Sequence, residues 1–105
     1  MNWVKRQIQK WNLPAALEKT RQENVTELDL SDRGLSELPA ELLKLTNLKK
    51  LNLSNNKLTS VPPELGQLQN LTEVSLSRNQ LASVPPELGQ LQNLTELSLD
   101  SNQLT

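Results

Sequence analysis

The sequence has 105 residues, 35% of them hydrophobic, and a formal net charge of -1, which indicates a single domain and disfavours a nucleic-acid-binding surface. No apolar run approaches the ~20 residues that a membrane-spanning helix needs, and the first residues do not resemble a secretory signal. The chain contains no Cys, so a disulfide framework is excluded and we expect a reducing, cytoplasmic location.

Residues suited to catalysis are scarce. His, Cys and Tyr are absent, which removes the commonest acid–base and nucleophilic groups. The glycines are too few and too scattered for a phosphate-binding loop. Glu27, Asp29 and Asp32 come from one short strand and its turn, so a solvated surface is favoured over a metal or acid–base site. We therefore predict no enzyme activity, no metal and no cofactor.

Residues 1–24 are predicted to form an N-terminal helical cap. A first amphipathic helix over residues 2–12 carries on its apolar face Val4, Ile8 and Trp11. Pro14 then starts a second helix. The basic face of the first helix would also suit a membrane surface or a partner. We favour a role of these helices in covering the first repeat, because both Trp residues lie here and the end of a repeat array needs large apolar side chains.

From residue 25 the sequence repeats with a period of 23 residues. Residues 60–73 recur unchanged as residues 83–96. Self-similarity at such a period is typical of a repeat array. The predicted repeats are unit one (25–47), unit two (48–70), unit three (71–93) and a partial unit four (94–105).

Each unit predicts a short strand followed by a tight helical return. In unit two, apolar residues near the start alternate with polar ones, which indicates a strand with one buried face; these apolar residues are Leu48, Leu51, Leu53 and Leu58. The later apolar residues Val61, Leu65 and Leu68 are spaced by four and three, as in a helical turn or 3₁₀ segment. Pro62-Pro63 excludes a strand at the entry to this segment.

The shared pattern, LxxLxLxxNxLxxLPxxLxxLxx, resembles the leucine-rich repeat family over residues 25–105. The resemblance implies an α/β fold: a right-handed solenoid with one parallel strand per repeat on a concave face and helical or 3₁₀ segments on the convex side. The lead-in LEKTRQENVTELDLSDRGLSELP, residues 17–39, is also similar to the first-repeat region of bacterial and cyanobacterial leucine-rich proteins, including those of Roco type.

An asparagine follows the strand of three units, at Asn56, Asn79 and Asn102. Its amide is expected to bond backbone groups of its own turn and of a neighbouring turn. Unit one has Arg33-Gly34 at this place. We expect that turn to be solvated or satisfied by the cap, with Gly34 at a positive φ.

The resemblance also implies which residues form the concave face. Counted from the first residue of each unit, positions 3, 5 and 7 are exposed there and position 8 lies at the margin. The candidate protein-binding residues are Glu27, Asp29, Lys50, Asn52, Glu73, Ser75, Arg78, Glu96 and Ser98. A mildly acidic face of this kind would bind a basic or polar segment. The favoured alternative is a solvated surface, because binding hot spots are rich in Trp, Tyr and Arg.

Unit four stops after 12 residues. Without a covering layer its strand is an open edge, and four leucines would stay partly exposed, although burying a Leu is worth ~1.5–3 kcal/mol. These candidate self-association residues are Leu94, Leu97, Leu99 and Leu104. Such an end fits a fragment of a longer array, an engineered array, or a chain that pairs with another copy of itself.

Two functional hypotheses follow. The first is a non-catalytic interaction or scaffold module, natural or designed, that forms a homodimer or higher assembly through its C-terminal end. The second is a recognition fragment of a larger bacterial receptor or Roco-type GTPase protein, which binds another protein through its concave face. Both exclude nucleic acid and membrane as partners.

Overall fold

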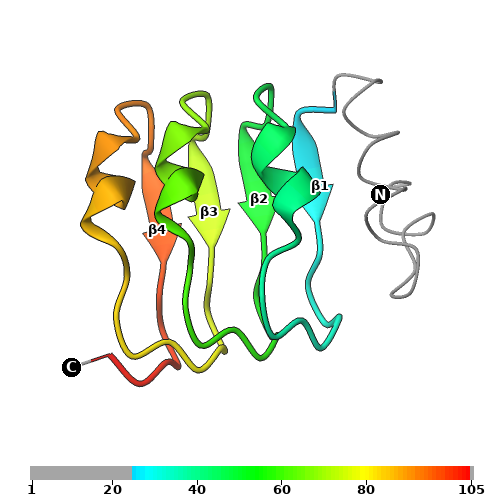
Figure 1. The fold of residues 1–105 in the computed structure, drawn as a ribbon, viewed down its shortest axis with the longest axis vertical. Helices are drawn as coiled ribbons and strands as arrows, with labels where there is room; N and C mark the ends of the chain where they lie inside the picture. The colour runs from blue at the N-terminus through cyan, green and yellow to red at the C-terminus, as the bar shows by residue number, and fades with distance from the viewer. Residues whose placement is uncertain (1–24, 105) are drawn as a thin grey trace.

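The computed structural model of the protein describes residues 25–104. The predicted helical cap over residues 1–24 lies outside the described residues. Short strands alternate with 3₁₀ helices, labelled η, along the described part of the chain (Figure 1). The elements are β1 (Glu27–Asp29), η2 (Ala40–Lys44), β2 (Lys50–Asn52), η3 (Pro63–Gln67), β3 (Glu73–Ser75), η4 (Pro86–Gln90) and β4 (Glu96–Ser98).

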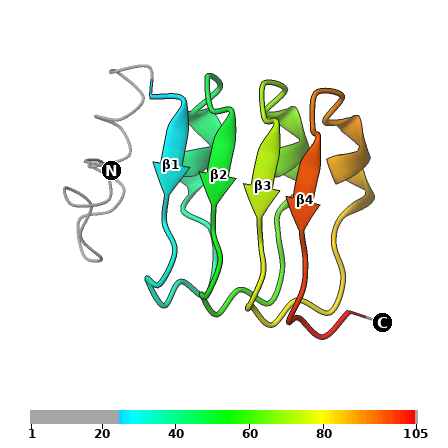
Figure 2. The same cartoon turned by 180° about the vertical axis from the view of Figure 1, so that it is seen from behind.

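The strands form one parallel sheet in the order β1-β2-β3-β4. Residues one period apart are paired, so Leu28 lies beside Leu51 and Val74 lies beside Leu97. Figure 2 shows the strands side by side on one face, with β4 at the outer edge and the 3₁₀ helices behind them. The parallel sheet with one strand per unit agrees with the sequence prediction.

An extended proline precedes each 3₁₀ return segment, and in units two and three a second proline follows it. Pro62 is extended, at φ -68 and ψ 145, and Pro63 occupies the first turn, where its missing N–H costs nothing. The bonds are of the tight i→i+3 kind: Leu65 N–H donates to the Pro62 carbonyl at 3.1 Å and Leu68 N–H donates to Leu65 at 3.2 Å. Such segments are short because their hydrogen-bond geometry is poor.

The core is a column of leucines between the sheet and the 3₁₀ helices. Its residues occupy equivalent positions in successive units, so each layer is covered by the next. Leu30, Leu53 and Leu76, each directly after a strand, are fully buried, and Leu42 and Leu65 of the 3₁₀ helices are also at 0% exposure in the same core. The apolar spacing in the sequence therefore predicted the buried face correctly.

One glycine controls how closely neighbouring 3₁₀ helices pack. A Cβ added at Gly66 of η3 would lie 2.3 Å from the backbone oxygen of Glu87 in η4, so only glycine fits without displacing a neighbour. Unit one carries Leu43 at the same position, and η2 packs less closely on η3 than η3 does on η4 (Figure 1). Gly89, the equivalent residue of η4, would meet nothing within 4 Å.

Candidate interaction surfaces

A ladder of asparagine amides ties each unit to the one before it. The Asn56 Nδ2 donates to the carbonyl of Leu53 at 2.9 Å in its own unit and to that of Leu30 at 3.0 Å in unit one. Its Oδ1 accepts the N–H groups of Arg33 and Leu35, each at 3.0 Å. The side chain is 7% exposed, so loss of these bonds would leave buried backbone groups without partners.

The same contacts recur in the next two units. Asn79 donates to the carbonyls of Leu53 and Leu76, both at 3.0 Å. Asn102 donates to the carbonyls of Leu76 and Leu99, at 2.9 and 3.0 Å. The asparagine contacts predicted from the sequence are therefore present in all three units.

The expectation for the turn of unit one was wrong in one respect. Its backbone N–H groups at Arg33 and Leu35 are satisfied by Asn56 of unit two, rather than by solvent or the cap. The asparagine serves the preceding unit, so a turn without its own asparagine still finds an acceptor. Gly34 adopts φ 66, as expected.

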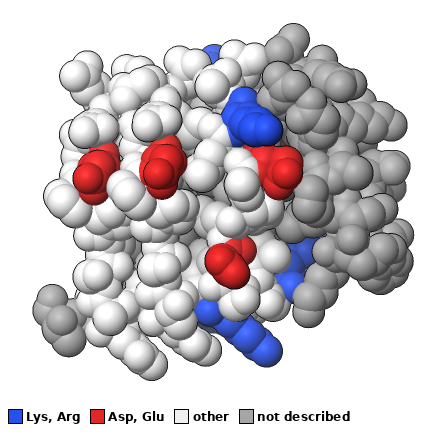
Figure 3. Space-filling model, in the orientation of Figure 1, with Lys and Arg blue, Asp and Glu red and all other residues white. Residues whose placement is uncertain are grey.

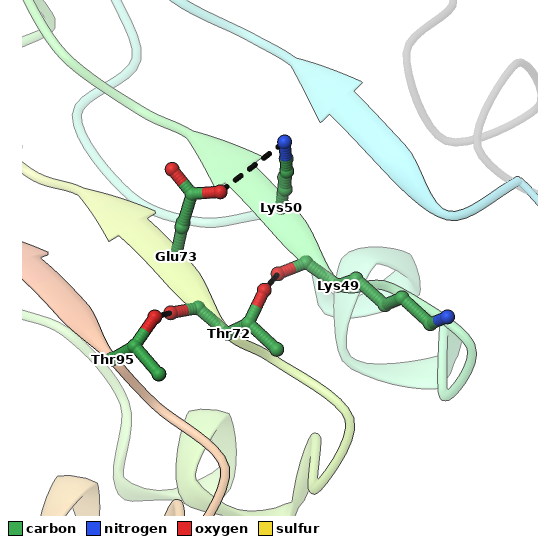
Figure 4. A network of polar contacts seen from close by, with 5 residues as sticks. All are labelled: Lys49, Lys50, Thr72, Glu73 and Thr95. Atoms are coloured by element: carbon green, nitrogen blue, oxygen red, sulfur yellow. Dashed lines mark hydrogen bonds and ion pairs between the residues drawn. The ribbon is translucent and has the colours of Figure 1, made fainter.

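Two further ladders were missed from the sequence. The Thr72 hydroxyl donates to the Lys49 carbonyl at 3.1 Å and the Thr95 hydroxyl donates to the Thr72 carbonyl at 3.0 Å (Figure 4). The Asn70 and Asn93 amides reach the carbonyls of Thr46 and Gln69 in the unit before, each at 2.9 Å. The signal available was the recurrence of Thr at position 2 of units three and four, and of Asn at the last position of units two and three.

The polar side of the sheet, formed by positions 3, 5 and 7, is largely hydrogen-bonded to itself; we call it the sheet face. Asp29 Oδ1 accepts the Ser31 hydroxyl at 2.6 Å, and Asn52 Oδ1 accepts the Ser54 hydroxyl at 2.7 Å. The Ser75 hydroxyl lies 3.1 Å from that of Ser77, and Ser98 is half-buried in β4. Polar groups that already have partners offer less to an incoming segment.

Position 3 forms a row of charges across the sheet face, because the register places Glu27, Lys50, Glu73 and Glu96 side by side. Lys50 Nζ lies 3.2 Å from a Glu73 carboxylate oxygen (Figure 4). This hydrogen bond, with the charges of Glu73, Glu27 and Glu96, raises the pKa of Lys50. The two side chains are 53% and 40% exposed, so the pair adds little to stability.

Position 8 has a backbone conformation that the sequence analysis did not anticipate. Asp32, Asn55, Arg78 and Ser101 all have φ between 58 and 61, a region that non-glycine residues rarely occupy. The N–H groups of the first three bond the following unit: Asp32 donates to the Ser54 carbonyl at 3.2 Å, Asn55 to that of Ser77 at 2.9 Å and Arg78 to that of Asp100 at 3.0 Å. The signal was Asp and Asn at two of the four positions, since both tolerate this region.

Among residues 25–104, acidic and basic side chains are interspersed on the opposite side of the molecule. Figure 3 shows this helix face as mostly uncharged, with acidic and basic side chains scattered over it. Each 3₁₀ helix carries one acidic residue in its first turn, namely Glu41, Glu64 and Glu87. Within residues 25–104 no group of three or more His, Cys, Asp or Glu could hold a metal ion, and no helix is long and apolar enough to cross a bilayer.

The C-terminal end of the array differs from every earlier layer. Leu97 is 36% exposed, whereas Leu28, Leu51 and Val74 at the same position are only 2–3% exposed. Leu104 is 42% exposed. Leu94 and Leu99 pack against the core but are half-buried. Each of the four leucines predicted for this end is thus at least partly exposed, and we call these four residues the unit-four end.

Comparison with family models identifies the fold. A model described as "Leucine rich repeat" matches residues 23–81, more than half of the chain. A second, for two copies of the repeat, matches residues 69–105. The chain belongs to the leucine-rich repeat family. Its repeats constitute a protein-interaction module of the leucine-rich type. No curated protein sequence matches the chain.

Solved leucine-rich repeat structures agree with this assignment. A leucine-rich repeat protein of Leptospira interrogans is 42% identical, with a TM-score of 0.60 over 85% of this chain and 29% of that one. The leucine-rich repeat domain of the type III effector XopL is 28% identical, with a TM-score of 0.76 over 87% of this chain and 32% of that one. This leucine-rich chain thus spans less than a third of the length of either relative.

A more distant solved structure supports the fold alone. A chain in the Toll–Spatzle complex of Drosophila is 20% identical, with a TM-score of 0.57 over 86% of this chain and 15% of that one. The narrower similarity of residues 17–39 to Roco-type proteins finds no counterpart among these relatives and stays a prediction.

Proposed function

We propose that this chain is a non-catalytic leucine-rich interaction module whose unit-four end binds a second copy of the chain. The observation that carries the proposal is the exposure of Leu97, 36% against 3% for Val74 one unit earlier. The two residues occupy the same position of successive units and are paired in the sheet, and Leu51 at that position is 2% exposed. Covering Leu97 would recover hydrophobic stabilisation of about 25 cal/mol for each Å² removed from water.

The surroundings of Leu97 support the same surface. Leu104 is also exposed, and Leu94 and Leu99 are half-buried. On the helix side Gly89 leaves open space where Gly66 is covered by η4. Among residues 25–104, strand β4 is the last strand of the sheet. An apolar end next to a free strand edge is a surface suited to strand addition.

The sheet face is the weaker candidate for self-association. Its hydroxyl and carboxylate groups at positions 5 and 7 bond one another, and Lys50 is paired with Glu73. Positions 3, 5 and 7 carry no residue of the kinds that dominate binding hot spots, and Arg78 at position 8 lies at the margin. A partner at this face would have to displace existing bonds before it gained new ones.

The test is the mass of the unaltered 105-residue chain in solution, measured by light scattering over a range of concentrations. We expect a dimer at high concentration and monomer on dilution. Leu97→Glu places a charge in the apolar contact and should abolish the dimer. Thr59→Glu, an exposed change in unit two, introduces the same charge away from the end and should leave it intact. A monomer at all concentrations contradicts the proposal.

A second function is favoured by a separate observation. Position 3 offers three Glu to one Lys across the sheet face, a charge balance that suits a basic partner segment. The relatives are about three times as long, so we also propose that the chain corresponds to part of a larger bacterial receptor or Roco-type GTPase protein, or to a designed array of that kind. Its test is binding of a lysine-rich peptide. Glu96→Lys should weaken binding, whereas Glu64→Lys on the helix face should not.

A further inference from the structure

We propose that Leu43 is a spacer between η2 and η3, which makes the array curve more between units one and two than between units two and three. The curvature of a repeat array follows from the small rotation between successive units. That rotation depends on how far apart two units lie on the sheet side and on the helix side. The two boundaries are alike on the sheet side and differ on the helix side.

The strands are held in the same way at both boundaries. Leu30 N–H donates to the Asn52 carbonyl at 2.8 Å between units one and two, and Leu53 N–H donates to the Ser75 carbonyl at 2.8 Å between units two and three. The register is also the same, because paired residues lie one period apart in both places. The strands of these three units are therefore evenly spaced.

The turn that follows each 3₁₀ helix is held equally at both boundaries. Asn70 Nδ2 donates to the Thr46 carbonyl at 2.9 Å, and Asn93 Nδ2 donates to the Gln69 carbonyl at 2.9 Å. These bonds fix the distance between neighbouring units where the helices end. The difference between the two boundaries is found in the 3₁₀ helices themselves.

The helices of units two and three approach closely because Gly66 has no side chain. A Cβ at this residue would overlap the Glu87 backbone oxygen in η4. Leu43 of η2 is equivalent to Gly66, and Glu64 of η3 is equivalent to Glu87. The facing residue is therefore Glu at both boundaries, whereas the residue that must fit against it changes from leucine to glycine.

The exposure of the two facing glutamates agrees with a wider separation at the first boundary. Glu64 is exposed, whereas Glu87 is half-buried. Leu43 is itself partly buried and packs against the core, so its side chain occupies space on the helix side. Figure 1 shows the result, since η2 and η3 stand farther apart than η3 and η4.

Even spacing on the sheet side and wider spacing on the helix side give units one and two the form of a wedge. The sheet face then bends more between β1 and β2 than between β2 and β3. This bend sets the tilt of Glu27 relative to Glu73 in the row of charges, although Leu43 lies on the other side of the sheet. The consequence for binding rests on the proposed role of the sheet face, whereas the curvature can be measured without a partner.

Pairs of nitroxide spin labels test the spacing, because the chain contains no Cys and labels can be attached to introduced cysteines. Lys44, Gln67 and Gln90 are exposed and end η2, η3 and η4. Dipolar broadening of the EPR spectrum should be weaker for Lys44→Cys with Gln67→Cys than for Gln67→Cys with Gln90→Cys. Each sample is diluted with unlabelled chain, so that coupling between molecules does not contribute.

Two pairs on the sheet face are the matched control. Glu27→Cys with Lys50→Cys spans the first boundary, and Lys50→Cys with Glu73→Cys spans the second. These two pairs should broaden equally, because the strands are evenly spaced. Unequal broadening here would mean that the boundaries differ on both sides and would overturn the wedge.

Substitution of the spacer should move the helices. Leu43→Gly should raise the broadening of the pair at residues 44 and 67 to that of the pair at residues 67 and 90, and Leu43→Ala should give an intermediate value. Leu38→Ala removes side-chain atoms from another half-buried leucine of unit one, outside η2, and should leave the broadening unchanged. Circular dichroism checks that each variant folds, and Leu43→Ala serves alone if Leu43→Gly does not.

The contrary results separate the parts of the proposal. Equal broadening of the two helix pairs in the chain with native Leu43 overturns the difference in spacing. Broadening that does not change in the folded Leu43 variants overturns the role of Leu43 as the spacer. Failure of the lysine-rich peptide to bind refutes the proposed role of the sheet face and leaves the label distances unaffected.

Discussion

Leu58 and Leu104 occupy the same position in units two and four, yet the first is fully buried and the second is 42% exposed. Their own units begin with the same strand pattern, and both follow an asparagine that bonds the preceding unit. The difference is the presence of a following unit. In this molecule burial is therefore a property of the stack, and a residue of one unit is stabilised mainly by its neighbour.

The largest expected effect comes from truncating a leucine of the core that the next unit covers. Leu58→Ala removes a fully buried side chain and should lower the free energy of unfolding by ~2–5 kcal/mol, the usual cost of such a cavity. Leu104→Ala should change it by less than about 0.5 kcal/mol. Denaturant unfolding at concentrations where the chain is monomeric measures both. Equal losses of unfolding free energy in the two variants would show that a leucine's position within its unit, rather than its burial by the next unit, determines its contribution to stability.

The asparagine ladder should show the next largest contrast. Asn56→Ala leaves the buried N–H groups of Arg33 and Leu35 without their acceptor and should cost ~1–3 kcal/mol. Asn102→Ala should cost less, because this side chain is half-exposed and water can replace it. The measurement is the same unfolding curve, with amide exchange at Leu35 as a local reading. An unchanged Leu35 exchange rate in Asn56→Ala would contradict the account.

Gly66 and Gly89 allow the covered and uncovered units to be compared on the side of the 3₁₀ helices. Gly66→Ala must displace the Glu87 backbone and should destabilise by ~1–3 kcal/mol, as overpacking does. Gly89→Ala has open space around it and should be neutral or stabilise by ~0.4–1 kcal/mol through the unfolded chain. Thermal or denaturant unfolding distinguishes the two. A similar loss of stability in both variants would mean that the conformation of the 3₁₀ helix, rather than its packing on the next one, requires glycine.

The smallest effect concerns the charge row on the sheet face. Glu73 raises the pKa of Lys50 above its ordinary value of 10.5, so the folded chain favours protonated Lys50. The stabilisation is present below pH 10.5 and is lost as the pH rises through the folded-state pKa. Glu73→Gln should lower the Lys50 pKa toward its ordinary value, as followed by NMR titration of its side chain. An unaltered titration would exclude the ion pair in solution.

Much of the fold could be predicted because the same pattern of apolar and polar residues recurs in successive units. The leucine spacing of unit two predicts both the strand at Leu51 and the 3₁₀ return at Leu65, since period-two and helical spacings differ. Candidate surface residues followed from the family pattern. The Asp29–Ser31 and Asn52–Ser54 bonds that occupy the sheet face could not be predicted, because residue identity alone does not tell which polar groups bond one another.

By itself, the sequence determined the period, the strand and return within each unit, the buried leucine face and the asparagine contacts. These are local or translationally repeated features, so one unit contains the information for all. The tertiary structure decided what depends on the next layer: that Asn56 serves the turn of unit one, that Gly66 must be glycine while Gly89 need not be, and that Leu97 stays exposed. Identical sequences differ here because the neighbour, rather than the unit, supplies the contact.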